Sequence, residues 1–194
     1  LQHSGDHLLE LINNVLDFSK LEAGRMELET RPFSVRDVVE DVLDALAPRA
    51  HEKGLVLHAF VARDVPACVN GDASRLRQIL VNLGANAVKF THEGEVAIDL
   101  RRLPAGDDSP CRLRFAVRDT GIGLDPAQRA RLFQAFTQAD GSTTRVYGGT
   151  GVGLAISNEL ARQMEGEIDV VSSPGAGAEF HCELDFELAA APAQ

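Results

Sequence analysis

A glycine-rich stretch late in the chain places the tightest limit on the fold. It begins at Gly148, reads "GGTGVGLAI", and opens a predicted helix over about 150–164. A dinucleotide-binding unit needs a strand before such glycines and a parallel strand after the helix. Here the polar segment 137–149 comes first, and two strand-like stretches at about 167–172 and 178–187 follow as a hairpin-like pair. The pattern therefore argues against a dinucleotide-binding fold.

Helix-like and strand-like stretches are interspersed along the rest of the chain. Ser34 and Asp37 form an S-x-x-D helix start, and Gly54 is placed to end that helix. The letters NGD at 70–72 predict a turn, with Asp72 capping the next helix. Further helices are expected over about 73–89 and after Pro126, and further strands over about 26–33, 55–61, 95–103 and 111–118. We therefore predict an α/β (α+β) two-layer sandwich rather than a doubly wound sheet.

Composition narrows the class of protein. The 194 residues carry a net charge of −10, which argues against wholesale binding of nucleic acid or anionic membranes. No run of about 18 apolar residues exists to span a bilayer. Cys68, Cys111 and Cys182 are far apart and form no C-x-x-C pair, so we expect reduced, buried thiols of a cytoplasmic protein. Residues 1–25 form an apolar helical stripe too broad for a lone surface helix, which favours one helix of a dimeric bundle over a helix folded back on its own domain.

The predicted helix 73–89 carries an unusual polar face. Asn82 and Asn86 are four residues apart and share one side of the helix, and Lys89 lies near the same side. Amide oxygens suit a hard cation such as magnesium, and a lysine offsets phosphate charge. Taken alone, the face is equally compatible with a solvated surface. Gly84 within this helix predicts the close approach of a neighbour.

Two glycine-rich turns complete a possible nucleotide site. Asp119 lies at the edge of a predicted strand and faces a turn. Its carboxylate can accept a hydrogen bond from an adenine amine, while Gly121 and Gly123 allow a flat ring to come close. A tight turn with a capping aspartate is the simpler alternative. The glycines Gly149, Gly151 and Gly153 at the next helix start can offer backbone N–H groups to phosphates. Together these patterns predict ATP with a magnesium ion (Mg²⁺) as the ligand.

Four motifs in a fixed order resemble the ATP-binding catalytic domain of sensor histidine kinases. The stretch "QILVNLGANAVKFT" looks like the family's asparagine box, "DTGIGL" like its first glycine box, and "LFQAFTQAD", with Phe133 and Phe136, like its phenylalanine box. The stretch "STTRVYGGTGVGLAIS" is similar to its lid and second glycine box. The resemblance implies a Bergerat-type fold, with a mixed sheet covered by helices on one face. The lid is most like that of the hybrid kinases, which carry receiver domains.

The resemblance also implies roles for individual residues. Asn82 and Asn86 would serve magnesium and phosphate, with Asn86 the more direct metal ligand, and Asn82 and Lys89 would take part in catalysis. Lys89 would contact phosphate and Asp119 the adenine. The remaining expected ATP contacts come from the glycine boxes and lid: Gly121, Gly123, Arg145, Tyr147, Gly149, Gly151, Val152, Gly153 and Leu154.

The same resemblance predicts how the chain is divided. Residues 1–25 resemble the second helix of the dimerisation and phosphotransfer hairpin, 26–188 the catalytic domain, and 189–194 a linker. The family's phosphoacceptor histidine box is missing, because His3 and His7 lack the acidic and proline neighbours of that box. We therefore expect the phosphoryl group to go to a histidine outside this chain.

Partners and alternatives follow from these expectations. The expected partners are the protein's own histidine-bearing helix and a response-regulator receiver domain. We expect a homodimer in the full-length protein, no nucleic acid, and a membrane only through segments outside this chain. The alternative function is a non-catalytic nucleotide-binding module that regulates a partner kinase. A stand-alone ATPase is less favoured. The resemblance to gyrase and chaperone ATPases implies a water-activating glutamate at the position where this chain has Asn82, and an amide cannot act as that base.

Overall fold

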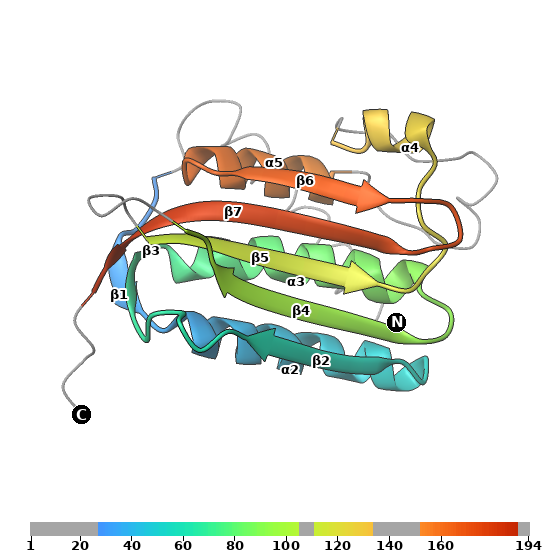
Figure 1. The fold of residues 1–194 in the computed structure, drawn as a ribbon, viewed down its shortest axis with the longest axis horizontal. Coiled ribbons are helices and arrows are strands. Elements are labelled where there is room, and N and C mark those ends of the chain that lie inside the picture. The colour runs from blue at the N-terminus through green and yellow to red at the C-terminus, as the bar shows by residue number, and fades with distance from the viewer. Residues whose placement is uncertain (1–26, 105–110, 134–151, 190–194) are drawn as a thin grey trace, which may run out of the picture.

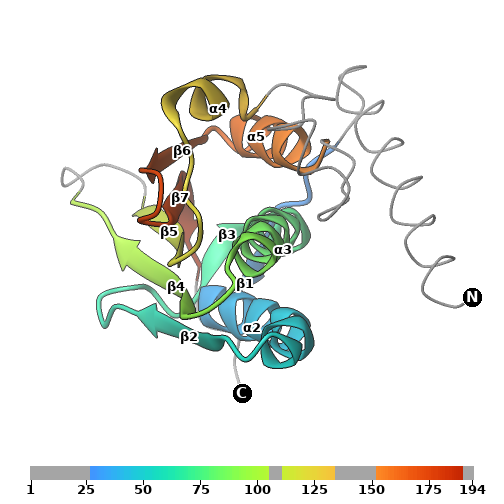
Figure 2. The same ribbon diagram turned by 90° about the vertical axis from the view of Figure 1, so that its right-hand side faces the viewer.

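The structure is a computed structural model that describes residues 27–104, 111–133 and 152–189. These residues form two layers, a twisted sheet and a layer of helices on one of its faces (Figures 1 and 2). The expected helix over 1–25, the polar segment 137–149 and residues 190–194 of the expected linker lie outside the described residues.

A single mixed sheet gathers the described strands (Figure 1). They are β1 (Arg31–Phe33), β2 (Val56–Val61), β3 (Val69–Gly71), β4 (Glu95–Arg102), β5 (Cys111–Asp119), β6 (Glu167–Ser172) and β7 (Ala178–Leu188). Their order is β1-β3-β7-β5-β4-β2, and β6 also pairs with β7. The β2–β4 pair is parallel and the others are antiparallel. The expected hairpin-like pair at the end of the chain is therefore β6 and β7.

Three long helices cover one face of this sheet (Figure 2). They are α2 (Val35–Glu52), α3 (Ala73–Phe90) and α5 (Gly153–Gln163), and a short α4 (Pro126–Arg131) lies near α5. Ser34 caps α2 by accepting from the backbone N–H of Asp37 (3.2 Å), and Gly54 follows α2 with a positive φ of 68°. Asp72 caps α3 as the sequence predicts, by accepting from Arg75 N (3.0 Å).

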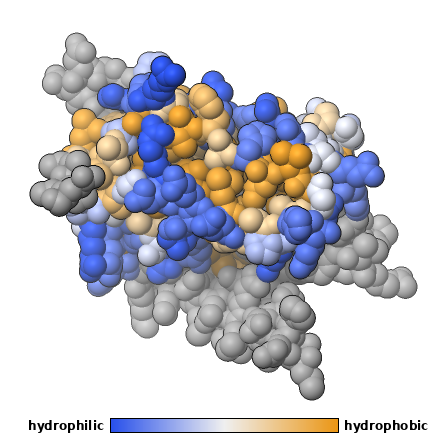
Figure 3. Space-filling model, turned by 90° about the horizontal axis from the view of Figure 1, so that it is seen from below, coloured by the Kyte–Doolittle hydropathy of each residue, from blue (hydrophilic) through white to orange (hydrophobic). Residues whose placement is uncertain are grey.

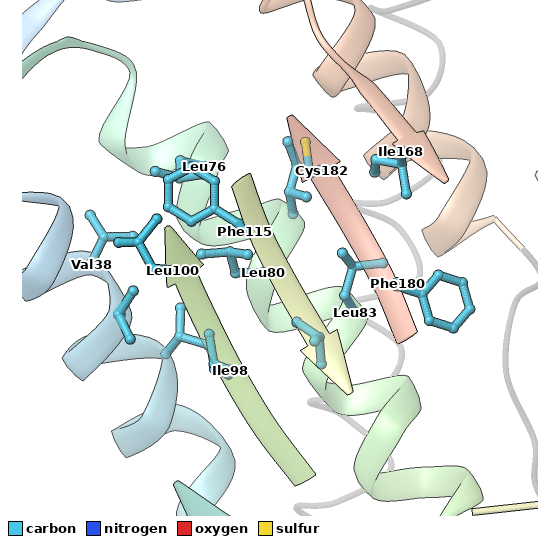
Figure 4. Packing of buried hydrophobic residues seen from close by; sticks show 14 of the residues in the cluster. Val38, Leu76, Leu80, Leu83, Ile98, Leu100, Phe115, Ile168, Phe180 and Cys182 are labelled. Carbon is cyan, nitrogen blue, oxygen red and sulfur yellow. The ribbon is translucent and has the colours of Figure 1, made fainter. Parts of the chain in front are cut away.

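The core lies between the sheet and the helices. Alternate residues of β4, β5 and β7 point toward α3, and Phe115 and Leu80 are fully buried there (Figure 4). Gly84 is buried where α2 and α3 cross, and a Cβ added to it would meet Cδ1 of Leu46. The close approach predicted for Gly84 is confirmed, and its neighbour is α2.

The structure corrects three of the expected elements. Residues 70–72 were predicted to form a turn, but Val69–Gly71 is strand β3, which pairs with β1 and with the end of β7. Neighbouring strands thus override the local turn preference of Asn-Gly. The first strand is only Arg31–Phe33, and α4 ends at Arg131 rather than near Phe133.

The opposite face of the sheet carries mainly charged side chains. Arg114 pairs with Glu179 (2.8 Å), and Arg112 pairs with Glu183 (3.2 Å) across neighbouring strands. The edge strand β2 leaves Val56 and Phe60 largely exposed. Figure 3 shows that apolar side chains lie among polar ones on the face of the molecule seen from below. Among the described helices, none has the length and apolar character needed to cross a membrane.

Candidate functional site

Helix α3 presents the predicted amide and lysine side chains at the border of its buried face. Asn82, Asn86 and Lys89 are each partly buried. The buried side of the same helix packs into the core through Leu76, Ile79, Leu80 and Leu83. The core therefore fixes the rotation of α3, and this rotation keeps the three polar residues along one border of the helix.

Helix α5 lies directly against Asn82. The Asn82 side-chain amide donates to the buried hydroxyl of Ser157 (2.7 Å). A Cβ on Gly153, the first residue of α5, would lie 2.6 Å from Asn82 Oδ1. Glycine therefore lets α5 begin this close to α3 without displacing the Asn82 side chain, and the structure brings together Asn82 of the predicted pair and the start of the second glycine-rich helix.

Asp119 ends β5 as predicted and is only 6% exposed. Its Oδ1 accepts from the backbone N–H of Gly121 (2.8 Å). Burial raises the pKa of the Asp119 carboxyl, and the backbone N–H groups of Gly121 and Ala178 oppose this effect. Within the described part of the chain no cation pairs with this carboxylate, and such a buried carboxylate is a good acceptor for a neutral amine donor of a ligand.

The loop after Asp119 rests on the C-terminal end of α3. A Cβ on Gly121 would meet the carbonyl oxygen of Phe90, the last residue of α3. The same oxygen accepts from Ile122 N (3.4 Å). The end of α3, which carries Lys89, and the loop that carries Asp119 are therefore in direct contact.

The loop is also held from its other side. Gly123 has a positive φ of 68°, and a Cβ there would meet the carbonyl oxygen of Ser173. Leu124 N donates to Ser172 Oγ (2.9 Å), and that hydroxyl donates to the Gly177 carbonyl (2.7 Å). The turn between β6 and β7 thus fixes the glycine loop.

Sequence reasoning missed several of these supporting residues. Ser157 and Ser172 gave no signal, because their partners are distant in sequence. Gly177 could have been found, since it forms another G-x-G turn with Gly175, and both have positive φ values. A Cβ on Gly177 would meet the backbone of Asp119.

Lys89 supplies a partly buried positive charge near this loop. Burial lowers the pKa of its ammonium group. The Nζ atom lies 4.8 Å from the centre of the Phe90 ring, a cation–π arrangement. A partly buried cation at this position suits a phosphate group.

Part of the predicted site cannot be placed. Arg145, Tyr147, Gly149 and Gly151 lie outside the described residues, as does Phe136. Of the remaining second-box residues, Val152 is buried at the start of α5, and Leu154 packs partly against the core. These two residues shape the start of α5 by apolar packing.

A comparison with protein families matches residues 71–188 to the family described as histidine kinase-, DNA gyrase B-, and HSP90-like ATPase. The chain belongs to that family. The match contains α3, the Asp119 loop and α5, which are the elements that the structure brings together.

Similar proteins show to which group within this family the chain belongs. Sensor protein GacS of Pseudomonas syringae pv. syringae is 50% identical over 189 residues, which cover 97% of this chain and 21% of that protein. Hybrid signal transduction histidine kinase L of Dictyostelium discoideum is 43% identical and is matched by 96% of this chain over 11% of its own length. The chain is therefore the ATP-binding catalytic domain of a two-component sensor histidine kinase and is close to the hybrid kinases.

A solved structure agrees with this assignment. The crystal structure of full-length ShkA in complex with AMPPNP superposes with a TM-score of 0.85 at 42% identity, and the match covers 98% of this chain and 38% of that one. The predicted Bergerat-type fold, a mixed sheet with helices on one face, is confirmed.

Proposed function

We propose that this histidine kinase domain transfers the γ-phosphoryl group of ATP to a histidine outside the chain. The observation that carries the proposal is the convergence of the predicted site on α3. Asn82 touches the start of α5, and the end of α3 touches the Asp119 loop. The asparagine motif on α3, the Asp119 loop and the start of α5 are far apart in the sequence but lie together around one helix, as binding of one ligand by all three requires.

The described residues fit an adenine nucleotide. The buried Asp119 carboxylate would accept from the adenine amine, and glycine at 121 keeps side chains away from the plane of the base. Lys89 would offset phosphate charge. The second glycine box at the start of α5, together with Arg145, Tyr147, Gly149 and Gly151, would cover the phosphate tail.

Magnesium fits the amide oxygens on α3. We assign Asn86, with Asn82, to hold the ion, and magnesium would supply neutralisation of charge on the phosphates. The chain's own residues would bind and orient the nucleotide. The bond from the β–γ bridging oxygen to the γ-phosphorus breaks as the histidine nitrogen bonds to that phosphorus, and ADP leaves.

Hydrolysis by this domain alone should be negligible. An amide cannot take a proton from water at neutral pH, and the Asn82 side chain already donates to Ser157. The site is therefore suited to a positioned acceptor side chain rather than to activated water.

The partners and division of the full protein extend the same proposal. We assign residues 26–188 to the catalytic domain, 1–25 to a helix of the dimerisation hairpin and 189–194 to a linker. The protein would act as a homodimer at the cytoplasmic side of any membrane to which other segments attach it. The phosphorylated histidine would then pass its phosphoryl group to a receiver domain.

The decisive experiment mixes the chain with a separate helical hairpin that carries the acceptor histidine. With γ-labelled ATP and magnesium, we expect acid-labile label on the hairpin. A hairpin with glutamine at the acceptor position and an Asn86→Ala chain are the matched controls, and neither should give label. Nucleotide binding without any label would instead favour a regulatory module. Stoichiometric ADP release by the chain alone would favour an ATPase.

A further inference from the structure

Lys53 lies just after α2, yet its ammonium group reaches the end of α3. Its Nζ donates to the carbonyl oxygens of Val88 (2.8 Å), Lys89 (2.7 Å) and Thr91 (3.1 Å). Three acceptors match the three donors of an ammonium group. The site residues that the sequence predicted did not include Lys53.

These contacts complete the hydrogen bonding of the helix end. The last carbonyls of a helix have no partner within the helix. The Ala87 carbonyl accepts from N (3.1 Å) and Oγ1 (2.7 Å) of Thr91, and the Phe90 carbonyl accepts from Ile122 N in the glycine loop. Lys53 supplies the donor for the two carbonyls between them. The last turn of α3 is therefore closed from two directions, by α2 and by the nucleotide loop.

We propose that Lys53 is a positioning residue for the nucleotide site, an inference that rests on the proposed function. The residue whose carbonyl it binds, Lys89, carries the predicted phosphate contact on its side chain. The next residue, Phe90, supports Gly121 and Ile122. A positive charge is also favoured at a helix C-terminus.

The role of Lys53 is positional. Water can replace its hydrogen bonds to the carbonyls, but water cannot hold the last turn of α3 in a fixed position. Lys53 is itself exposed, so solvent can reach the carbonyls of Val88 and Lys89 if the ammonium is removed. Water would then solvate a last turn that frays more often. Both the Lys89 side chain and the loop resting on Phe90 would lose their fixed position relative to Asn82 and α5.

The first test compares Lys53→Met with the native 194-residue chain. We expect amide hydrogen exchange at 88–91 in the nucleotide-free variant to rise about tenfold, with little change in β5. We expect the Kd for ADP with magnesium to rise about tenfold, the loss of one charged interaction of ordinary strength. Arg49→Met is the matched control, because Arg49 is an exposed cation on the last turn of α2. It should change neither measurement.

A chemical rescue separates positioning from general damage. The chain's cysteines Cys68, Cys111 and Cys182 are buried, and burial raises the pKa of Cys182 to about 12. Lys53→Cys therefore introduces a single accessible thiol. Its thiolate displaces bromide from 2-bromoethylamine and forms a carbon–sulfur bond, which gives a side chain of lysine length and charge. Iodoacetamide gives a neutral adduct.

The proposal requires that aminoethylation restore both the exchange protection and the ADP affinity, and that the neutral adduct restore neither. Equal rescue by both adducts would overturn it, as would faster exchange at 88–91 in the Lys53 variants with unchanged ADP affinity. Global unfolding of both Lys53 variants would also overturn it, because the whole fold would then depend on this residue. Failure of the native chain to bind ADP would refute the proposed function, and the exchange measurements would still decide whether Lys53 holds the end of α3.

Discussion

Asp119 combines deep burial with a proposed function that needs a charge. Because burial raises its pKa above the unfolded value, the carboxyl favours the folded state most at low pH, and this contribution is lost as pH rises through the folded pKa. At neutral pH the ionised side chain thus costs folding stability. The proposed adenine contact would give this cost in stability a function.

Asp119→Asn should therefore separate binding from stability. We expect the affinity for ATP to fall about tenfold or more, and the preference for ATP over GTP to shrink, since the charge is removed and one buried acceptor oxygen is replaced by an NH2 donor. The free energy of unfolding at pH 7 should stay equal or rise slightly. Calorimetric titration with both nucleotides and urea unfolding measure these effects. Asp44→Asn, on the exposed side of α2, is the control. Unchanged selectivity would argue against the adenine contact.

Asn86 is the residue on which the predicted metal site depends. Asn86→Ala should remove most of the increase in ADP affinity that magnesium produces, while affinity measured in EDTA stays similar. Stability should not fall, because alanine is the better helix former by about 0.7 kcal/mol or less. Gln78→Ala, which removes an amide from the same helix, is the control. An intact magnesium effect would exclude Asn86 as a ligand.

Among the secondary-structure elements, the contact of α2 with α3 depends on one glycine. Gly84→Ala should destabilise the domain by about 1–3 kcal/mol through overpacking against Leu46, despite the helix propensity gained. Leu46→Ala alone should cost about 2–5 kcal/mol by leaving a cavity. Urea unfolding of the two single variants and the double variant completes the cycle.

In that cycle the double variant should be less destabilised than the sum of the single variants. The added methyl group would occupy part of the space that Leu46 leaves, so the two sites are coupled. Additive effects would show that the chain relaxes around the new methyl without involving Leu46.

Sequence patterns predicted those elements whose ends are set by residues within or next to the element. The start of α2 followed from Ser34 and Asp37, and the end of β5 at Asp119 followed from the glycines after it. Strand β3 was missed because three residues with an Asn-Gly pair become a strand only between β1 and β7. Lys53 was missed for a related reason, because its acceptors begin 35 residues further along the chain.

For the whole molecule, nucleotide binding should appear as added stability. A ligand that binds only the folded state at 100 times its Kd adds about 2.7 kcal/mol to the free energy of unfolding. We expect ATP with magnesium to raise the melting temperature accordingly, and EDTA to remove part of the rise. Thermal unfolding followed by circular dichroism, with GTP as the control nucleotide, measures this. Equal shifts with GTP would contradict adenine selectivity.

The hydrogen bonds at both ends of α3 have a mechanical consequence. At its start, Asp72 accepts from Arg75 N and also from Glu29 N (3.0 Å), which ties the incoming chain to the helix. At its C-terminal end, Lys53 donates to the carbonyls of Val88 and Lys89, and Ile122 N donates to the carbonyl of Phe90. A lengthwise shift of α3 would break its bonds to Lys53 and Ile122 at one end and disturb the bond to Glu29 at the other. Through these contacts, a displacement of Glu29 would be passed along α3 to the Asp119 loop that rests on its other end.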